Sequence, residues 1–502
     1  KSLPETKKLR TIYTGGRNVR NLQINTGGRF VSYVLVKEAT DARHTIIPNY
    51  VTESGFTEDI NGRTKVGAPL GASELFVYDR EKDTVITVTT EDIPGIRDLP
   101  DFVNDYPELL KKKKQENAVR QVSITGVTWS PKGNYAVVDI DALDNKDRWL
   151  MKLDAVTGKL SLLNRQRDEA WVGGPGINSG NTGWINENLF WFQSEATGYA
   201  HIYTVDITTG KKTALTSGQY EVQKCLLSGN KKYFYITTNE VHAGEQQLYR
   251  LPVTGGRAER ITTMTGANNV ILSPGEKQAA ILYSYSNKPW ELFLQDNKPG
   301  AKTEQLTFKA QSDLFKTYAW RDPEMVSITA SDGKQVQARL YRPANPHPSK
   351  PAVIFVHGAG YLQNAHKWWS SYFREYMFHN LLADNGYYVL DMDYRASAGY
   401  GRDWRTGIYR HMGGKDLTDN IDGAKYLTEK CGVDPKHIGI YGGSYGGFIT
   451  LMALFTSPGT FAAGAALRPV TDWAHYNQGY TSNILNTPAE DSIAYRRSSP
   501  IY

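Results

Sequence analysis

The chain has 502 residues, of which 40% are hydrophobic and 22% charged, and its formal net charge at pH 7 is +6. This length is too great for a single hydrophobic core, so two or more domains are expected. The small net charge and the scattered basic residues argue against a nucleic-acid-binding protein. The one basic cluster, residues 111–114, lies in a polar stretch typical of a solvated surface.

Three further features bound the class of protein. Two cysteines, Cys225 and Cys431, fall in different predicted domains, which argues against a disulfide framework. No run of 18 apolar residues occurs, so no membrane-spanning helix is expected. The chain begins with Lys1 rather than methionine and shows no signal-peptide pattern, so we expect the natural N-terminus to lie upstream.

Residues 1–320 contain a repeat of paired β-hairpins. Each unit has a strand, a polar turn rich in Pro, Gly or Asn, a second strand with period-two alternation, and then another hairpin. The units begin near Leu22, Val127, Thr182, Cys225 and Val270. Four strands per unit at a spacing of roughly 45 residues are typical of a β-propeller. A β-sandwich of similar strands is the alternative, and the regular four-strand period favours the propeller.

Five blades are visible in this repeat. The first unit is longer because residues 91–121, with a short helical segment, are inserted after it. Residues 8–13 resemble the last strand of an earlier blade, so we expect an incomplete propeller with further blades upstream.

A second domain is expected over residues 321–502, after a linker at 311–321. Here strands alternate with helices, which predicts a parallel sheet covered on both faces. We expect a hairpin at 326–341, helices at 370–385 and 415–431, and strands at 352–356, 387–391, 438–441 and 461–466. This pattern predicts an α/β-hydrolase domain.

A candidate nucleophile lies between the third of these strands and the helix that follows it. Gly442-Gly443-Ser444-Tyr445-Gly446 fits the G-x-S-x-G elbow, in which a sharp turn exposes the serine hydroxyl above the sheet. Glycines are needed two residues before and after the serine because a Cβ there would clash. An ordinary Gly/Ser loop is the alternative, but the strand before and the helix after favour a nucleophile.

The same region offers donors for an oxyanion. In this fold one donor is the backbone N–H after the nucleophile, here that of Tyr445, and a second comes from the loop after an earlier strand. The loop at 357–360, which begins with His357 and Gly358, occupies that place, although a simple strand-to-helix turn is the alternative. His357 precedes Ser444, whereas hydrolases of this fold place the base after the serine, so a loop-shaping or oxyanion role is favoured.

A propeller followed by a hydrolase with Gly-Gly-Ser-Tyr-Gly-Gly resembles the prolyl oligopeptidase family of serine peptidases. Within that family the chain is similar to the dipeptidyl-peptidase IV and acylaminoacyl-peptidase branches. The segment 393–401, which reads Asp-Tyr-Arg-Ala-Ser-Ala-Gly-Tyr-Gly, looks like the family's strand-end motif. The resemblance covers the whole chain in architecture and is most specific over residues 350–485.

The resemblance also implies a specificity pocket. Residues 470–480 are similar to the segment that walls this pocket in dipeptidyl-peptidase IV. The residues implied to line it are Tyr445, Val470, Trp473, Tyr476 and Tyr480. Aromatic walls suit a small flat side chain such as proline or alanine and exclude charge. An ordinary aromatic core is the alternative.

Two departures from the family bear on activity. Residues 120–127, where the resemblance places the acids that bind a substrate's free amine, contain no acid, which puts obligate dipeptide release in doubt. At the family's spacing, the triad aspartate and histidine would lie beyond residue 502. Asp472 and His475 follow Ser444 but lie too close together to stand at two strand ends. We therefore expect this chain to lack the C-terminal part of the hydrolase and to be a poor catalyst alone.

The sequence thus predicts, for the parent protein, a serine peptidase that cleaves oligopeptides after a small apolar residue through an acyl-enzyme on Ser444. An acylaminoacyl peptidase or esterase of the same fold is one alternative. A non-catalytic propeller that serves as a binding platform is another. No metal-ligand spacing or nucleotide fingerprint occurs, so neither metal nor cofactor is expected. Peptides are the expected partners; the resemblance allows a homodimer and favours a periplasmic or secreted location.

Overall fold

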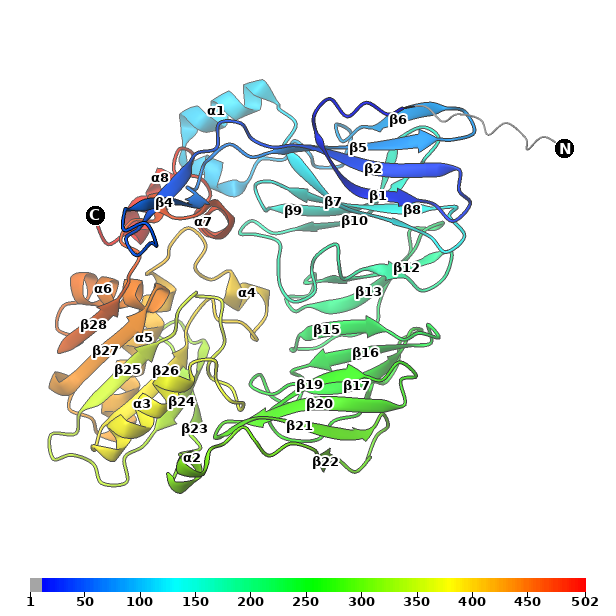
Figure 1. The fold of residues 1–502 in the computed structure, drawn as a ribbon. Coiled ribbons are helices and arrows are strands. Elements are labelled where there is room, and N and C mark those ends of the chain that lie inside the picture. The colour runs from blue at the N-terminus through cyan, green and yellow to red at the C-terminus, as the bar shows by residue number, and fades with distance from the viewer. Residues whose placement is uncertain (1–10) are drawn as a thin grey trace.

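The computed structural model describes residues 11–502. Residues 8–10 of the strand expected at 8–13 lie outside the described residues, and residues 11–13 do not form a strand. Figure 1 shows two regions: a series of small sheets formed by the first part of the chain, and a larger sheet flanked by helices formed by the second. We call them the blade region (residues 18–305) and the mixed-sheet region (residues 324–502). The division into domains at residue 320 stays a prediction.

The blade region contains five four-stranded antiparallel sheets that follow one another along the chain (Figure 1). In four of them the strands are consecutive in sequence, as in propeller blades; in the first, β3 and β4 are inserted between the second and third strands. Closure of these sheets into a ring stays a prediction. The first two sheets contain β1 (Asn18–Ile24), β2 (Phe30–Lys37), β5 (Ala72–Asp79), β6 (Thr84–Val88), β7 (Val122–Trp129), β8 (Ala136–Ala142), β9 (Asp147–Leu153) and β10 (Leu160–Arg167). The other three contain β11 (Gly183–Trp184), β12 (Leu189–Ser194), β13 (His201–Asp206), β14 (Lys212–Ala214), β15 (Val222–Leu227), β16 (Tyr233–Thr238), β17 (Gln247–Pro252), β18 (Glu259–Arg260), β19 (Ala267–Leu272), β20 (Gln278–Tyr285), β21 (Lys288–Asp296) and β22 (Glu304–Gln305).

Alternating side chains of these strands form the cores between sheets. Val138, Ile140, Trp149 and Met151 of the second sheet are each at most 1% exposed and share one cluster with side chains of the first sheet. The period-two pattern in the sequence produces this burial, because every second residue of a strand points to the same face.

Two insertions extend from the blade region toward the C-terminal helices. A two-stranded ribbon, β3 (His44–Asn49) with β4 (Glu58–Thr64), leaves the first sheet. Just after it, Val66 donates a backbone hydrogen bond to Tyr476 and Gly67 donates one to the Gln478 side chain. The second insertion carries η1 (Asp101–Asp105) and α1 (Pro107–Glu116). Both lie beside α7 (Gln478–Leu485) and α8 (Ser492–Ser498) in Figure 1.

The mixed-sheet region is built on one six-stranded sheet in the order β23-β24-β26-β25-β27-β28. The pairs β25–β26, β25–β27 and β27–β28 are parallel, and β23 and β24 form the expected antiparallel hairpin. The strands are β23 (Glu324–Thr329), β24 (Gln335–Tyr341), β25 (Ala352–Val356), β26 (Tyr388–Asp393), β27 (Ile438–Gly443) and β28 (Ala463–Leu467). The remaining helices are α2 (Asp313–Thr317), α3 (Phe373–Asp384), α4 (Arg402–Arg405), α5 (Lys415–Cys431), α6 (Tyr445–Thr456), η2 (Pro435–His437) and η3 (Trp473–His475).

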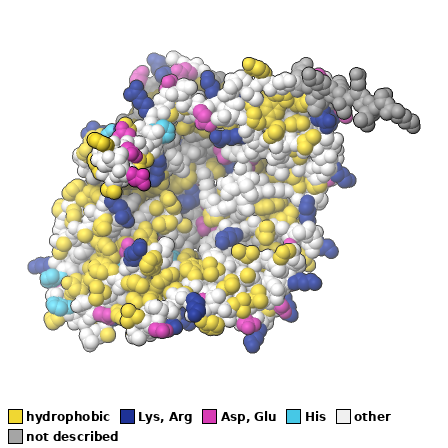
Figure 2. All heavy atoms as spheres, viewed as in Figure 1, with side chains coloured by type: hydrophobic (Ala, Val, Ile, Leu, Met, Phe, Trp, Pro, Cys, Tyr) yellow, Lys and Arg dark blue, Asp and Glu magenta, His cyan; other side chains and the backbone are white. Residues whose placement is uncertain are grey.

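The two regions meet across a polar interface. In four ion pairs the mixed-sheet region supplies the cation and the blade region the carboxylate: Lys367–Glu245, Arg402–Asp168, Arg405–Glu195 and Arg410–Asp105. Lys113–Glu490 has the opposite polarity. Figure 2 shows one face of the molecule, where hydrophobic side chains gather over the mixed-sheet region. Among residues 11–502, no helix combines the length and apolar character needed to cross a bilayer.

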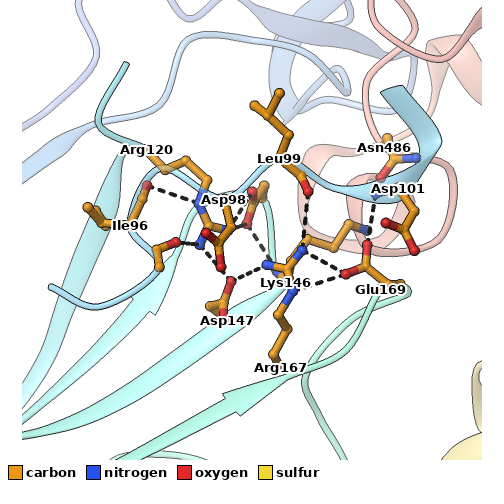
Figure 3. Close-up of polar contacts among 12 residues, drawn as sticks. Ile96, Asp98, Leu99, Asp101, Arg120, Lys146, Asp147, Arg167, Glu169 and Asn486 are labelled. Carbon is orange, nitrogen blue, oxygen red and sulfur yellow. Dashed lines mark hydrogen bonds and ion pairs between the residues drawn. The ribbon is translucent and has the colours of Figure 1, made fainter. Parts of the chain in front are cut away.

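A buried carboxylate ties the second insertion to its sheet (Figure 3). Asp147, 1% exposed at the start of β9, accepts from Arg120 at 2.6 Å, Arg165 at 2.6 Å and Arg167 at 2.7 Å. Arg120 also donates to the carbonyls of Gly95 and Ile96 within the insertion. One carboxylate therefore joins three cations from two segments that are separate in the sequence.

The neighbouring Lys146 reaches across the interface. Its side chain is fully buried, its ammonium donates to the Ala170 carbonyl, and Nζ lies 4.3 Å from the ring centroid of Tyr409. Burial lowers the pKa of Lys146 to about 8, although nearby carboxylates, Asp144 first, act in the opposite direction.

Replacing the shared carboxylate should destabilise the blade region strongly. Asp147→Asn leaves three arginines without their common anion, and we expect a loss of about 3–5 kcal/mol, the usual result of breaking a buried pair. The matched control is Glu169→Gln, which removes the ion pair between Arg167 and Glu169. Because the Glu169 side chain is 38% exposed, we expect this change to lower the free energy of unfolding by less than about 1 kcal/mol. Chemical denaturation of both variants measures the difference, and equal losses would contradict the assignment.

Lys146 predicts a pH dependence of stability. Because its folded-state pKa is lowered from 10.5 to about 8, the native state binds fewer protons than the unfolded state between those values. The contribution of this residue to stability therefore rises as the pH increases through that window. We therefore compare the Tm of Lys146→Met with that of the wild type at two pH values. The Tm difference, variant minus wild type, should be more positive at pH 7 than at pH 10. A difference that does not change with pH would contradict this.

Candidate active site

Ser444 lies in a strained turn between β27 and α6. Its backbone angles are φ 58° and ψ −114°, a combination that non-glycine residues rarely adopt. The turn is held by a hydrogen bond of 3.0 Å from the Ser444 N–H to the Leu467 carbonyl, and by one of 2.9 Å from the Phe448 N–H to the Ser444 carbonyl. The strand–turn–helix context that the motif requires is therefore present.

The glycines around Ser444 exist because backbone passes very close to them. A Cβ on Gly442 would lie 2.4 Å from the Val356 carbonyl oxygen, and one on Gly446 would lie 2.0 Å from the same atom. A Cβ on Gly447 would lie 2.6 Å from the Leu467 carbonyl oxygen, a constraint that the motif alone does not reveal. These contacts let α6 pack directly over β25 and β28.

Tyr445 contributes both its backbone and its ring to the site. Its N–H is the first of α6, where the helix dipole favours a developing negative charge. Its ring, 1% exposed, is fixed by a hydrogen bond of 2.6 Å from Oη to Asp416 Oδ2. Burial raises the pKa of Asp416 to about 6, and hydrogen bonds from Tyr445, Gly413 and Leu417 oppose this shift.

The loop at 357–361 lies against the nucleophile turn. A Cβ on Gly358 would lie 3.8 Å from Ser444 Cβ, and one on Gly360 would lie 3.5 Å from Tyr445 Cε2. The Gly358 N–H donates to the Tyr372 hydroxyl at 2.8 Å. The loop therefore lies beside Ser444. In this structure the Gly358 N–H is hydrogen-bonded to the Tyr372 hydroxyl.

His357 is directed away from the nucleophile and into the protein. The ring is fully buried, with Nε2 at 2.9 Å from Ser397 Oγ and Nδ1 at 3.0 Å from the Gly358 carbonyl oxygen. It stacks on Tyr394 with ring centroids 4.4 Å apart. These contacts suit the loop-shaping role, and the oxyanion role of the ring stays a prediction.

The residues expected to line the specificity pocket form one aromatic cluster. The Trp473 ring centroid lies 5.8 Å from that of Tyr445, 5.4 Å from that of Tyr476 and 5.9 Å from that of Tyr480. Tyr445 and Trp473 are each 1% exposed, whereas Tyr476, Tyr480 and Val470 are half-buried. The first two form the back of the cluster and the others its outer part.

A cavity of about 420 Å³ opens beside this cluster. Tyr480 lines it together with Gly360, Tyr361, Arg405, Asn477 and Ile484 from the mixed-sheet region and Trp171 from the blade region. Among the residues described, the Tyr480 hydroxyl has no hydrogen-bond partner. The cavity therefore adjoins both the loop at 357–361 and the interface between the two regions.

Within residues 11–502 no hydrogen bond joins Ser444 Oγ to a histidine. His475 is largely exposed and interacts instead with Asp472, at 3.4 Å, and with Lys65 Nζ, at 3.1 Å. Asp472 caps η3 by accepting from the Ala474 N–H. The described residues also contain no group of three or more His, Cys, Asp or Glu that could hold a metal ion.

Sequence reasoning did not single out several residues that shape this site. Tyr372 and Asp416 carry no motif, because their partners lie on other elements. Asp393 and Ser397 belong to the segment 393–401. Their position just after a predicted buried strand was the only feature of the sequence that could have marked them as site residues. Their contacts with His357 require the fold to be known.

Two parts of the chain match known protein families. Residues 373–502 match the model of the prolyl oligopeptidase family, and residues 65–290 match that of the dipeptidyl peptidase IV N-terminal region. The chain is 27% identical to "Probable dipeptidyl-aminopeptidase B" of Coccidioides posadasii over 94% of its own length and 51% of the relative. It is 26% identical to "Dipeptidyl peptidase 4" of Trichophyton equinum over 74% of its length and 49% of the relative.

The fold has a matching crystal structure. Dipeptidyl peptidase 4 of Porphyromonas gingivalis superposes with a TM-score of 0.74 at 22% identity, covering 96% of this chain and 64% of that one. The chain spans about half the length of the curated relatives named above. The two family matches and the shared fold support the predicted combination of propeller-type and hydrolase-type parts. The C-terminal part of the chain is thus similar to the prolyl oligopeptidase family, and its N-terminal part is similar to the N-terminal region of dipeptidyl peptidase IV.

Proposed function

We propose that the full-length protein is a serine peptidase that hydrolyses short peptides after a small apolar residue. The observation that carries this proposal is the backbone of Ser444, which is held in a strained turn at the start of a helix. Strain of this kind costs of order 1–3 kcal/mol and persists where the surrounding structure enforces it, commonly at functional sites. The names of the relatives, which are dipeptidyl peptidases, support the same reaction class.

In the proposed reaction, Ser444 Oγ attacks the scissile carbonyl carbon, and the leaving amine departs with a proton to give an acyl-enzyme. The Tyr445 N–H and the N-terminus of α6 stabilise the oxyanion, and the loop at 357–361 borders it. Water then releases the acyl group. Within residues 11–502 no histidine is hydrogen-bonded to Ser444 Oγ. The proposed reaction therefore requires that the full-length protein supply a general base and the carboxylate that orients it.

The proposed preference for a small apolar residue, proline or alanine, rests on the aromatic cluster. The rings of Tyr445 and Tyr480 pack on that of Trp473, and Tyr480 also lines the cavity beside them, where its aromatic face suits a compact apolar group. The relatives' names favour release of N-terminal dipeptides, and a comparison of free and N-acetylated substrates tests this mode.

Ser444 should be the single reactive serine. With a fluorophosphonate probe we expect one adduct per molecule of the full-length protein, located on Ser444 by peptide mass spectrometry, and no adduct on Ser444→Ala. Ser457→Ala, at the C-terminus of α6, is the matched control and should label fully. An adduct that persists in Ser444→Ala, or a wild type that does not label, would refute the proposal.

Tyr480 should act through its ring rather than its hydroxyl. We expect Tyr480→Ala to lower kcat/KM for Gly-Pro and Gly-Ala anilides by about 100-fold, because the apolar contact of a whole aromatic ring with the substrate is lost. Tyr480→Phe should stay within about threefold, since the hydroxyl has no partner among the described residues. Steady-state kinetics on both substrates decide this, and a Phe variant as impaired as the Ala variant would contradict it.

A further inference from the structure

A fully buried polar network holds the loop at 357–361 from behind. His357 Nε2 lies 2.9 Å from Ser397 Oγ and 3.5 Å from Asp393 Oδ1, and all three side chains are 0% exposed. These are the residue types of a catalytic triad. Because none of the three side chains is accessible to a substrate, the set supports the loop rather than providing a second nucleophile.

The network fixes the backbone of the loop as well as the ring. The Gly358 carbonyl oxygen can only accept, so His357 Nδ1 must donate in their contact of 3.0 Å. Tyr394 Oη donates to the His357 carbonyl oxygen at 2.7 Å. Asp393 Oδ1 accepts from the Asn364 N–H at 2.7 Å, which fixes the backbone three residues after this loop. A shift of Asp393 or Ser397 would therefore displace the residues that border Ser444.

The segment that carries Asp393 and Ser397 makes hydrogen bonds to the blade region at its C-terminal end. Asn239 Nδ2 donates to the Gly399 carbonyl oxygen at 2.9 Å, and the Gly401 N–H donates to Glu221 Oε1 at 3.1 Å. The Arg402 N–H donates to the Gly198 carbonyl oxygen at 2.8 Å. A Cβ on Gly401, where φ is +85°, would lie 2.7 Å from that oxygen, so this contact has no free space.

We propose that Glu221 of the blade region is a positioning residue for the loop at 357–361, acting through residues 393–401. Glu221 and Asn239 lie at one end of the same sheet, since Glu221 precedes β15 and Asn239 follows β16. The Glu221 backbone N–H donates to Asn239 Oδ1 at 2.8 Å, so the backbone of Glu221 fixes the Asn239 side chain that binds Gly399. Glu221 is 4% exposed, and its carboxylate holds Gly401 in place.

This inference rests on the proposed function, because it assigns Glu221 a part in positioning the loop at 357–361 that borders the proposed oxyanion. It predicts that the side chain at position 221 must accept the hydrogen bond from the Gly401 N–H but need not carry a negative charge. In the full-length protein, Glu221→Ala leaves the Gly401 N–H unpaired, and we expect kcat to fall about tenfold with KM changed less than about twofold. Glu221→Gln retains a carbonyl acceptor and should restore kcat to within about twofold of the wild type.

Asp105→Ala is the matched control for a general loosening of the interface. It removes the ion pair with Arg410, whose Nη1 lies 2.6 Å from Asp105, and this pair does not contact residues 393–401. We expect its kcat to stay within about twofold of the wild type. Equal losses in Glu221→Ala and Asp105→Ala, or an unchanged kcat in Glu221→Ala, would overturn the inference.

A measurement that does not depend on turnover separates this inference from the proposed function. In protein labelled with ¹⁵N-histidine, we expect Glu221→Ala to shift the imidazole nitrogen resonances of His357, assigned with His357→Asn, and Asp105→Ala to leave them unchanged. Unshifted resonances in Glu221→Ala would refute the positioning role. A wild type that fails to label with fluorophosphonate but shows the shift would refute the proposed function and leave the positioning role standing.

Discussion

The close approach of β25 to the start of α6 is the constraint on which the candidate site depends. The Val356 carbonyl oxygen lies where a Cβ of Gly442 or of Gly446 would stand. Side chains at either position would push the helix away from the sheet. Ser444 would then lose the backbone geometry that exposes it, and the Tyr445 N–H would lose its position at the helix terminus. The turn at Ser444 and the position of the Tyr445 N–H therefore depend on the absence of side chains at Gly442 and Gly446.

Buried polar groups perform the remaining positioning. His357, Ser397 and Asp393 are withdrawn from solvent, a cost that is offset only if their hydrogen bonds are made. Asp147 with its three arginines follows the same rule in the blade region. Such networks are specific because each donor needs one acceptor in one place. They therefore determine how loops from separate elements fit together, which apolar packing alone does less selectively.

The sequence was informative where structure is local. The hairpin repeat predicts strands that form five sheets, and the G-x-S-x-G motif predicts the turn at Ser444, because both depend on neighbouring residues. Helix α5 has the predicted bounds, whereas α3 begins at Phe373, three residues later than expected. The reason is that Ser370 donates to Asn364 and accepts from the Tyr372 N–H, so it belongs to the loop. The partners of His357 and of Asp147 lie on distant segments, and no periodicity encodes such contacts.

The contact between the β3–β4 ribbon and the mixed-sheet region has a consequence for synthesis. Gly67 and Gln478, which are joined by a hydrogen bond, are 411 residues apart in the chain. A ribosome adding about 5–20 residues per second needs tens of seconds to supply the second partner after the first. During that time the exposed apolar side chains of the ribbon, among them Ile46, Tyr50 and Phe56, lack this anchor, so chaperone binding to the nascent chain would have its longest opportunity there.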